Sequence, residues 1–229
     1  MTSTPTLRPR TTQEPEPDLT SLVVTHRAIR QDLRRLADRL AEAGELEPGR
    51  ARPVCRYAAA LLAATRTHHQ NENDIIWPLI AATAREAVDL VPLADDRLVV
   101  EQALSQAELA LASFAAEPGT GAALQASVSE LRGLADEHIA DEEAQLLPAM
   151  RRYVSAEAYR WAERQIMRKA AAPGPVFIVP WMARHARDAE LRPLLAAGGW
   201  RAKVALALGR RHYSRLERRA FSSAQPINH

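Results

Sequence analysis

The chain has 229 residues, a net charge of +2 and a single cysteine, Cys55. This length fits one sizeable domain with an extension, and the 9 glycines and 5% aromatic residues favour helix over strand. One cysteine excludes an intramolecular disulfide and any multi-cysteine metal site, and we expect Cys55 to be chemically inert. No apolar run approaches the roughly 20 residues of a transmembrane helix, and the N-terminus lacks an apolar signal stretch. We therefore expect a soluble, cytoplasmic protein.

The predicted elements, in chain order, are a tail and a series of helices. Residues 1–17 offer little to bury, so we predict a disordered tail. Apolar residues then recur at helical spacing between glycine and proline breaks, and we expect Pro78 and Pro148 to end their helices. Four long helices are predicted, over about 20–43, 53–76, 94–116 and 121–147, with a shorter helical piece at about 79–89. We interpret residues 18–152 as an all-α, up-and-down four-helix bundle.

The second and fourth of these helices carry the same pattern near their C-terminal ends. His68 precedes Glu72 by four residues, as His138 precedes Glu142, and a proline follows each glutamate six residues later. Side chains four apart lie on one helix face, so each helix presents an imidazole together with a carboxylate. A third histidine, His26, lies on or beside the apolar stripe of the first helix.

These residue types favour a metal site. One helical histidine is more often a packed core residue, and helical glutamates are usually solvated, but the repeated pair and the third histidine outweigh that interpretation. Buried carboxylates are costly unless a cation neutralises them. Imidazole with carboxylate suits iron, manganese or zinc, and the absence of thiolates argues against a structural zinc site. In a four-helix bundle, inward His and Glu side chains can bridge two metal ions roughly 3.5–4 Å apart.

The same residues make the chain resemble a known family. The pattern consists of His26, of His68-His69-x-x-Glu72 running into Ile75-Ile76-Trp77-Pro78, and of His138-x-x-x-Glu142-Glu143 running into Leu146-Leu147-Pro148. Residues 18–152 thereby resemble a hemerythrin-like (HHE cation-binding) domain. The resemblance implies a non-haem di-iron centre bridged by Glu72 and Glu142, with terminal ligands His26, His68 and His138. Three neighbours are expected to lie outside the coordination: His69, Asp74 and Glu143.

The third helix departs from the family pattern, which expects one or two histidines there. Aligning residues 23–33 with 99–109 places Gln102 where the first half has His26, and glutamine is a poor, neutral ligand. Three arrangements stay open: a second iron with an open position or extra water, a substitute carboxylate such as Glu101, or one tightly bound metal. Reversible O2 transport needs a saturated di-iron site, so peroxide chemistry, nitric oxide chemistry or sensing is favoured instead.

Residues 153–229 form a basic extension, with helices predicted at about 155–170 and 200–221. Residues 1–150 carry 14 Lys and Arg against 23 Asp and Glu, whereas residues 151–229 carry 16 against 5. We expect the extension to pack on the acidic bundle, with its arginines pairing with bundle carboxylates, because no nucleic-acid-binding signature stands out. It also resembles the C-terminal extension of some bacterial members of the same family.

Three further features of the extension and the bundle end give expectations. The apolar run Val176–Met182 could form a homodimer interface. His185 and His212 lie in arginine-rich stretches without a carboxylate at ligand spacing, so we expect both at the surface. Trp77, next to Pro78, is expected to cover the end of the bundle core.

Two functions are compatible with these features. The first is a hemerythrin-like, non-haem iron protein that binds, senses or detoxifies O2, peroxide or nitric oxide; an enzymatic version would be a metal-dependent oxidoreductase. Its metal ligands would be His26, His68, Glu72, His138 and Glu142, holding one or two ions. The second is a non-enzymatic interaction module with a degenerate or structural metal site, acting through its basic extension.

Overall fold

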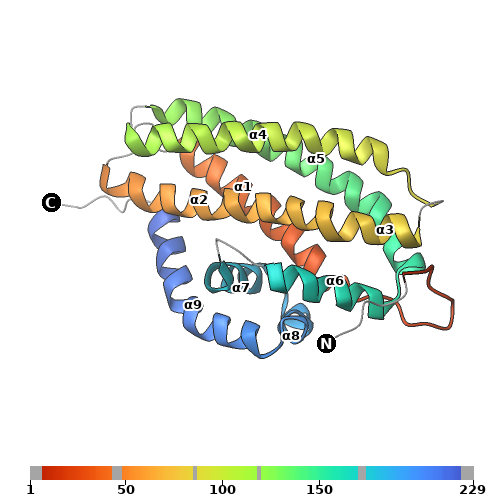
Figure 1. Ribbon diagram of the computed structural model, residues 1–229. Helices are drawn as coiled ribbons and strands as arrows, with labels where there is room; N and C mark the ends of the chain where they lie inside the picture. The colour runs from red at the N-terminus through yellow and green to blue at the C-terminus, as the bar shows by residue number, and fades with distance from the viewer. Residues whose placement is uncertain (1–6, 43–47, 85–86, 118–119, 170–173, 223–229) are drawn as a thin grey trace.

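The computed structural model describes residues 7–42, 48–84, 87–117, 120–169 and 174–222, and within them every regular element is a helix. The bundle comprises α1 (Thr20–Glu42), α2 (Pro48–Asn71), the π-helical turn η1 (Glu72–Ile76), α3 (Trp77–Thr83), α4 (Leu90–Ala116) and α5 (Gly121–Tyr153). The extension comprises α6 (Ala156–Lys169), α7 (Gly174–His185), α8 (Asp188–Ala197) and α9 (Gly199–Phe221). Figure 1 shows the extension gathered against α1 and α2, on the side away from α4 and α5. The predicted all-α fold with a helical extension is confirmed.

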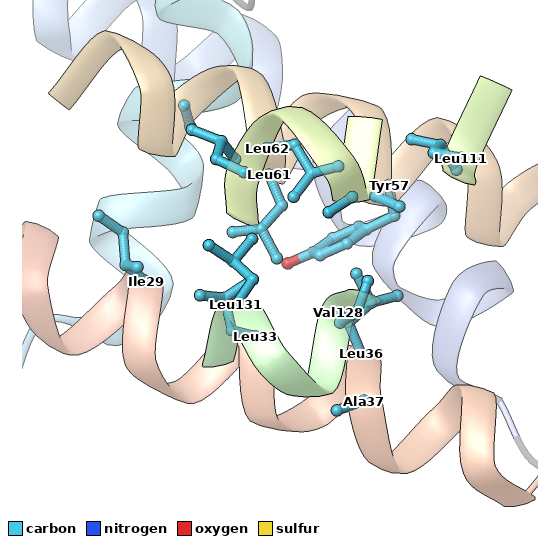
Figure 2. Close-up of a cluster of buried hydrophobic side chains, with 14 of the residues drawn as sticks. Ile29, Leu33, Leu36, Ala37, Tyr57, Leu61, Leu62, Leu111, Val128 and Leu131 are labelled. Carbon is cyan, nitrogen blue, oxygen red and sulfur yellow. The ribbon is translucent and has the colours of Figure 1, made fainter. Parts of the chain in front are cut away.

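The main core lies where the apolar stripes of the four long helices meet. In α1 the fully buried positions Ile29, Leu33 and Leu36 recur every three or four residues, as one face of a helix requires. They pack against buried side chains of α2 and α5, and Figure 2 shows this cluster around Tyr57. Removing each such side chain from water contributes about 1.5–3 kcal/mol, so this cluster holds the bundle together.

A second apolar cluster closes one end of the bundle. It joins the residues that follow the two His/Glu pairs, including Ile75 and Ile76 after Glu72 and Leu146 and Leu147 after Glu142. Trp77 belongs to it and is buried, and the guanidinium of Arg97 lies 4.5 Å from its ring centre. Along the chain, each His/Glu pair follows residues of the main core and precedes residues of this second cluster. Packing on both sides therefore fixes the positions of the His and Glu side chains.

Neither proline ends its helix as we predicted. After α2 the chain makes one π-helical turn and continues as α3, where Pro78 occupies the first turn. Proline is tolerated in the first turn of a helix, where its fixed φ already suits helical geometry. Pro148 lies inside α5, which continues to Tyr153. Burial of the flanking residues Leu147 and Ala149 keeps this last part of α5 helical against the roughly 3 kcal/mol cost of an internal proline.

Part of the segment that we predicted to be disordered contacts the folded chain. The amide of Arg10 donates to the carbonyl of Tyr153 at 2.7 Å, and the amide of Ala156 donates to the carbonyl of Pro15 at 3.3 Å. Leu7 packs against the second apolar cluster. These contacts offset the entropy of ordering, so the prediction is wrong for residues 7–17. Residues 1–6 and residues 43–47 lie outside the described part.

The extension is docked on the bundle by apolar and charged contacts. Phe177 and Trp181 of α7 and Tyr213 of α9 are buried in the main core. Of the apolar run Val176–Met182, only Val176 is exposed, so most of that run is used within the chain. No helix of the described residues is long and apolar enough to cross a bilayer.

Most of the ion pairs at this junction reverse the arrangement that we expected, in which arginines of the extension pair with carboxylates of the bundle. Two of them join an arginine of the bundle to a glutamate of the extension: Arg27 to Glu190 at 2.6 Å, and Arg35 to Glu217 at 3.0 Å. Lys169 with Asp74 is a pair in the expected direction. The few acidic residues of the extension therefore contribute to docking, although its net charge is basic.

A buried carboxylate, Asp32 of α1, is the polar centre of this junction. It accepts hydrogen bonds from the hydroxyl of Tyr57 and, at 2.8 Å, from the indole of Trp181, and Arg35 donates to it at 2.9 Å. Nε2 of His185 lies 3.2 Å from the same carboxylate. Burial alone would raise the pKa of Asp32, but His185, Tyr57 and Arg35 outweigh that effect and lower it.

His185 is therefore not a surface residue, contrary to our expectation. Its Nδ1 donates to the side-chain oxygen of Gln31 at 2.9 Å, and the residue is buried between α1 and α7. His212 is exposed, as expected.

Replacement of Asp32 tests how strongly this buried carboxylate holds the extension. Asp32→Ala leaves the Tyr57 and Trp181 donors buried without their acceptor, and we expect a loss of roughly 3 kcal/mol in the free energy of unfolding. Urea denaturation measures the loss. The matched control is Asp38→Ala on the same helix, where an exposed carboxylate lies 3.8 Å from Arg132, and a change below about 0.5 kcal/mol is expected. Equal losses in the two variants would contradict the assignment.

Candidate metal centre

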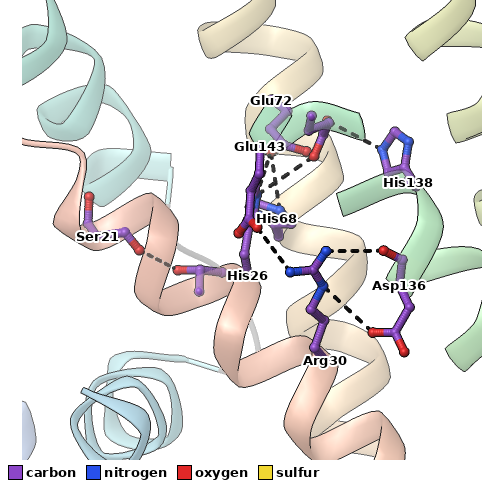
Figure 3. Close-up of polar contacts among 10 residues, drawn as sticks. Ser21, His26, Arg30, His68, Glu72, Asp136, His138 and Glu143 are labelled. Atoms are coloured by element: carbon purple, nitrogen blue, oxygen red, sulfur yellow. Dashed lines mark hydrogen bonds and ion pairs between the residues drawn. The ribbon is translucent and has the colours of Figure 1, made fainter. Parts of the chain in front are cut away.

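Three segments bring the five predicted ligands together inside the bundle. His26 comes from α1, His68 and Glu72 from the junction of α2 and η1, and His138 and Glu142 from α5. All five are buried, with exposed fractions of at most 8%. Figure 3 shows His26, His68, Glu72 and His138 converging between α1, α2 and α5.

Four of these residues form a compact set, here called the ligand quartet: His26, His68, Glu72 and Glu142. One donor atom from each lies within 4.8 Å of those of the others. Nε2 of His26 lies 3.6 Å from Oε1 of Glu72 and 3.7 Å from Oε2 of Glu142, and Nε2 of His68 lies 3.2 Å from Oε1 of Glu72. The quartet thus offers two imidazoles and two carboxylates to one ion.

His138 lies outside the quartet but beside one of its members, Glu142. Its Nε2 is 3.3 Å from Oε1 of Glu142, whereas the other oxygen of that carboxylate faces His26. The ring of His69 lies beside it, with 5.8 Å between the ring centroids. Glu142 therefore faces His26 with one oxygen and His138 with the other.

The unpartnered atoms of the site fit a cation. Nε2 of His26, His68 and His138, Oε2 of Glu72 and both oxygens of Glu142 are buried without a hydrogen-bond partner. Buried polar atoms are normally paired, and an unpaired carboxylate oxygen is especially costly. A metal ion in the quartet would satisfy the unpaired atoms of its four residues that face one another, since each is a nitrogen or oxygen donor of the kind that iron, manganese or zinc accepts.

Burial and neighbouring charges shift the pKa values of the site's carboxylates and imidazoles. Burial and the neighbouring Glu142 carboxylate raise the pKa of Glu72 to about 7. Burial opposes protonation of His26, but Glu143 and Glu72 outweigh it and raise the pKa of His26 to about 9. Burial lowers the pKa of His68 well below its usual value, which keeps this imidazole neutral and able to bind a metal.

A polar chain orients His26. Its Nδ1 donates to Oε1 of Glu143 at 3.2 Å, and Arg30 holds the other oxygen of Glu143 at 3.0 Å while donating to the carbonyl of Asp136. Figure 3 shows this chain from Arg30 to His26. Because Glu143 holds the proton on Nδ1, Nε2 is the nitrogen that would lose its proton and bind a metal ion in the quartet. Glu143 thus acts through His26, which agrees with its predicted place outside the coordination.

The third-helix assignment of Gln102 is wrong. Gln102 is exposed on α4, and Glu101 is 33% exposed, with Oε1 3.9 Å from Nε of Arg97. The face of α4 that turns inward carries Leu93, Arg97 and Val100. The short alignment of the two halves misplaced the register of α4, since a shift of one residue rotates a side chain by about 100°.

Arg97 is the residue that the sequence interpretation missed. It is buried, its Nε and one terminal nitrogen lack hydrogen-bond partners, and its charge helps to lower the pKa of His69. The available signal was its spacing, because Arg97 falls on the apolar stripe between Leu93 and Val100. The charged guanidinium of Arg97 therefore lies on the α4 side of the site, towards His69.

The π-helical turn η1 was also not predicted. Its wider turn lets Glu72, Ile75 and Ile76 all face inward. Glu72 therefore reaches the quartet while the following isoleucines close the apolar end of the bundle.

Comparison with known proteins agrees with the site. A family model described as the hemerythrin HHE cation binding domain matches residues 18–160. No curated protein and no solved structure matches the chain.

The titration of the site makes the stability of the metal-free protein depend on pH. His26 keeps a proton up to a pKa of about 9, against an ordinary value of 6.5, so its stabilising contribution is lost as the pH rises through that interval. His68 and His69, whose pKa values are lowered, contribute below pH 6.5, outside this window. We therefore expect the melting temperature of metal-free protein to fall from about pH 6.5 to about pH 9. The pKa values of His138 and Glu72 are also raised and act in the same direction, so His26→Gln should reduce the slope without abolishing it. A rising wild-type profile would contradict the assignment.

Glu143 gives a test of ligand orientation. In Glu143→Ala, Nδ1 of His26 loses its acceptor, and we expect affinity for ferrous iron to fall about 10- to 100-fold. Competition with a colorimetric chelator measures the affinity. Glu137→Ala removes an exposed glutamate from the same helix and should bind the metal as wild type does. Equal affinities for the two variants would exclude the orienting role.

Proposed function

This chain belongs to the hemerythrin HHE cation-binding domain family, and we propose that it is a non-haem iron protein that binds a small ligand such as O2, peroxide or nitric oxide. The observation that carries the proposal is the ligand quartet, in which buried imidazole and carboxylate donors from three segments converge without other partners. We propose that His26, His68, Glu72 and Glu142 hold the first ion, and that His138 with Glu142 forms the second, weaker position.

The difference between the two positions supports unequal occupancy. The quartet has four donors, whereas the second position has His138 and one oxygen of Glu142. No histidine or carboxylate of the described part of α4 joins either position, and the buried guanidinium of Arg97 lies on the His69 side of the site. A nearby cation disfavours a second metal ion. We therefore propose one tightly bound iron, with a second that binds weakly.

An incompletely filled coordination shell determines what the centre can do. Bound iron would supply an open coordination position for a small ligand. The protein contributes the orientation of His26 by Glu143, the neutral imidazole of His68, and apolar clusters on both sides that exclude water. This arrangement favours peroxide or nitric oxide chemistry, or sensing, over reversible O2 transport. A cytoplasmic location remains our prediction.

Metal content tests the proposal. Protein produced with added iron should hold at least one iron per chain and show near-ultraviolet charge-transfer absorption. His68→Ala removes a quartet ligand and should abolish tight binding, whereas His138→Ala should keep the first iron and lose the second. His212→Ala, at an exposed histidine of α9, is the matched control.

Elemental analysis with a chelator titration distinguishes the outcomes. Equal loss of both irons in His138→Ala would contradict the proposed order of the two positions. A wild-type chain without iron, with unchanged melting temperatures in both ligand variants, would exclude the iron centre and favour the interaction-module hypothesis.

A further inference from the structure

An apolar chamber lies beside the ligand quartet, between the bundle and the extension. His68 and Glu72 form part of its wall, and α1 adds Ser21 and Thr25. The remaining wall comes from the extension, through residues of α6, α7, α8 and α9 such as Met167, Ile178, Met182 and Leu194. Figure 1 shows these four helices clustered on the α1 and α2 side of the bundle. Without the extension this side of the quartet would lack its cover.

The chemistry of the wall is largely apolar. Isoleucine, leucine, methionine and alanine side chains predominate, and Trp181 contributes its ring. The hydroxyls of Thr25 and Thr67 donate to carbonyls of their own helices at 2.8 Å, so their hydrogens are not available to an acceptor in the chamber. One part of the wall is polar. There the hydroxyl of Ser21 donates to Glu163 at 2.7 Å, and the hydroxyl of Tyr159 lies 3.4 Å from that of Ser21.

The size of the chamber exceeds the needs of a diatomic ligand. Its volume is about 200 Å³. An apolar cavity of about 150 Å³ stays dry and admits benzene, so this chamber can hold a substituted six-membered ring. An occupant of that size would have one end beside His68 and Glu72 and the rest among the extension helices.

The charges of the wall exclude one class of occupant. Glu163, a carboxylate outside the quartet, lines the chamber, and the described lining contains no arginine or lysine. An anionic head group would meet repulsion and lose its hydration without compensation. The chamber therefore suits a neutral molecule, with at most a hydroxyl or carbonyl group at its polar end.

We propose that this chamber binds an uncharged, mainly apolar organic molecule of about the size of a substituted benzene, placed against the quartet by the C-terminal extension. The extension thereby determines which molecule reaches the metal centre. The identity of the neighbouring centre rests on the proposed function, but the chamber and its apolar wall do not depend on a bound metal.

Calorimetric titration of the chelator-treated, metal-free chain with three probes of similar size tests the chamber, since a bound metal ion could hold benzoate directly. Toluene and phenol should each bind with one site per chain, and benzoate should bind at least tenfold more weakly because it carries the charge that the wall disfavours. Toluene has no atom that can ligate a metal, so its binding reports on the chamber alone. Absence of toluene and phenol binding up to their solubility limits would overturn the proposal, as would benzoate binding as tightly as phenol.

Variants locate the bound probe. Thr67→Phe places a ring in the chamber and should weaken toluene binding at least tenfold, whereas Gln70→Phe adds the same ring at an exposed position of α2 and should leave it unchanged. Met182→Ala enlarges the chamber and should allow naphthalene to bind, which keeps the proposal testable if Thr67→Phe fails to fold. Equal toluene binding in Thr67→Phe and wild type, or no gain of naphthalene binding in Met182→Ala, would place the probe elsewhere and overturn the proposal.

Iron content measured on the same samples separates this proposal from the function proposed above. A chain that loads iron but binds no toluene keeps the metal centre and loses the chamber proposal. A chain that binds toluene but loads no iron supports the chamber and counts against the metal centre.

Discussion

The burial of two carboxylates among histidines is the constraint on which the rest of the structure depends. Glu72 and Glu142 lie inside the bundle, between residues that feed two apolar clusters, where an unneutralised charge costs several kcal/mol. Histidines compensate only in part, because most oxygens of these carboxylates have no hydrogen-bond partner. The site is therefore stable only with protons or a cation in place, and the protein holds the donors ready for that cation through Arg30, Glu143 and the packed isoleucines of η1.

A third buried carboxylate shows the contrast. Asp32 is as deeply buried as Glu142, yet it accepts hydrogen bonds from Tyr57, Trp181 and Arg35. Its bonding capacity is satisfied by protein donors, so it fastens the extension to the bundle and leaves no place for an ion. Hydrogen-bond satisfaction, rather than burial or residue type, therefore separates the structural carboxylate from the carboxylates of the metal site.

The extension gives the site an asymmetric environment. One flank of the quartet faces the apolar chamber that α6 to α9 complete, whereas the His69 side faces the buried guanidinium of Arg97. Close packing makes this cover possible, since a Cβ at Gly209 of α9 would collide with the backbone of α7 at Val176. The same docking surface thus stabilises the fold and shapes the space next to the quartet.

The sequence by itself determined the helices and the two His/Glu pairs, because both depend on local spacing: apolar residues that recur every three or four positions, and ligands four residues apart. It also placed His26 on or beside the apolar stripe of α1. Only the tertiary structure decided that α4 turns Arg97 inward and Gln102 outward, that His185 is buried beside Asp32, and that Pro78 and Pro148 stay within helical segments. Each of these depends on side chains distant in sequence, whose packing energy outweighs the local preferences that a sequence pattern records.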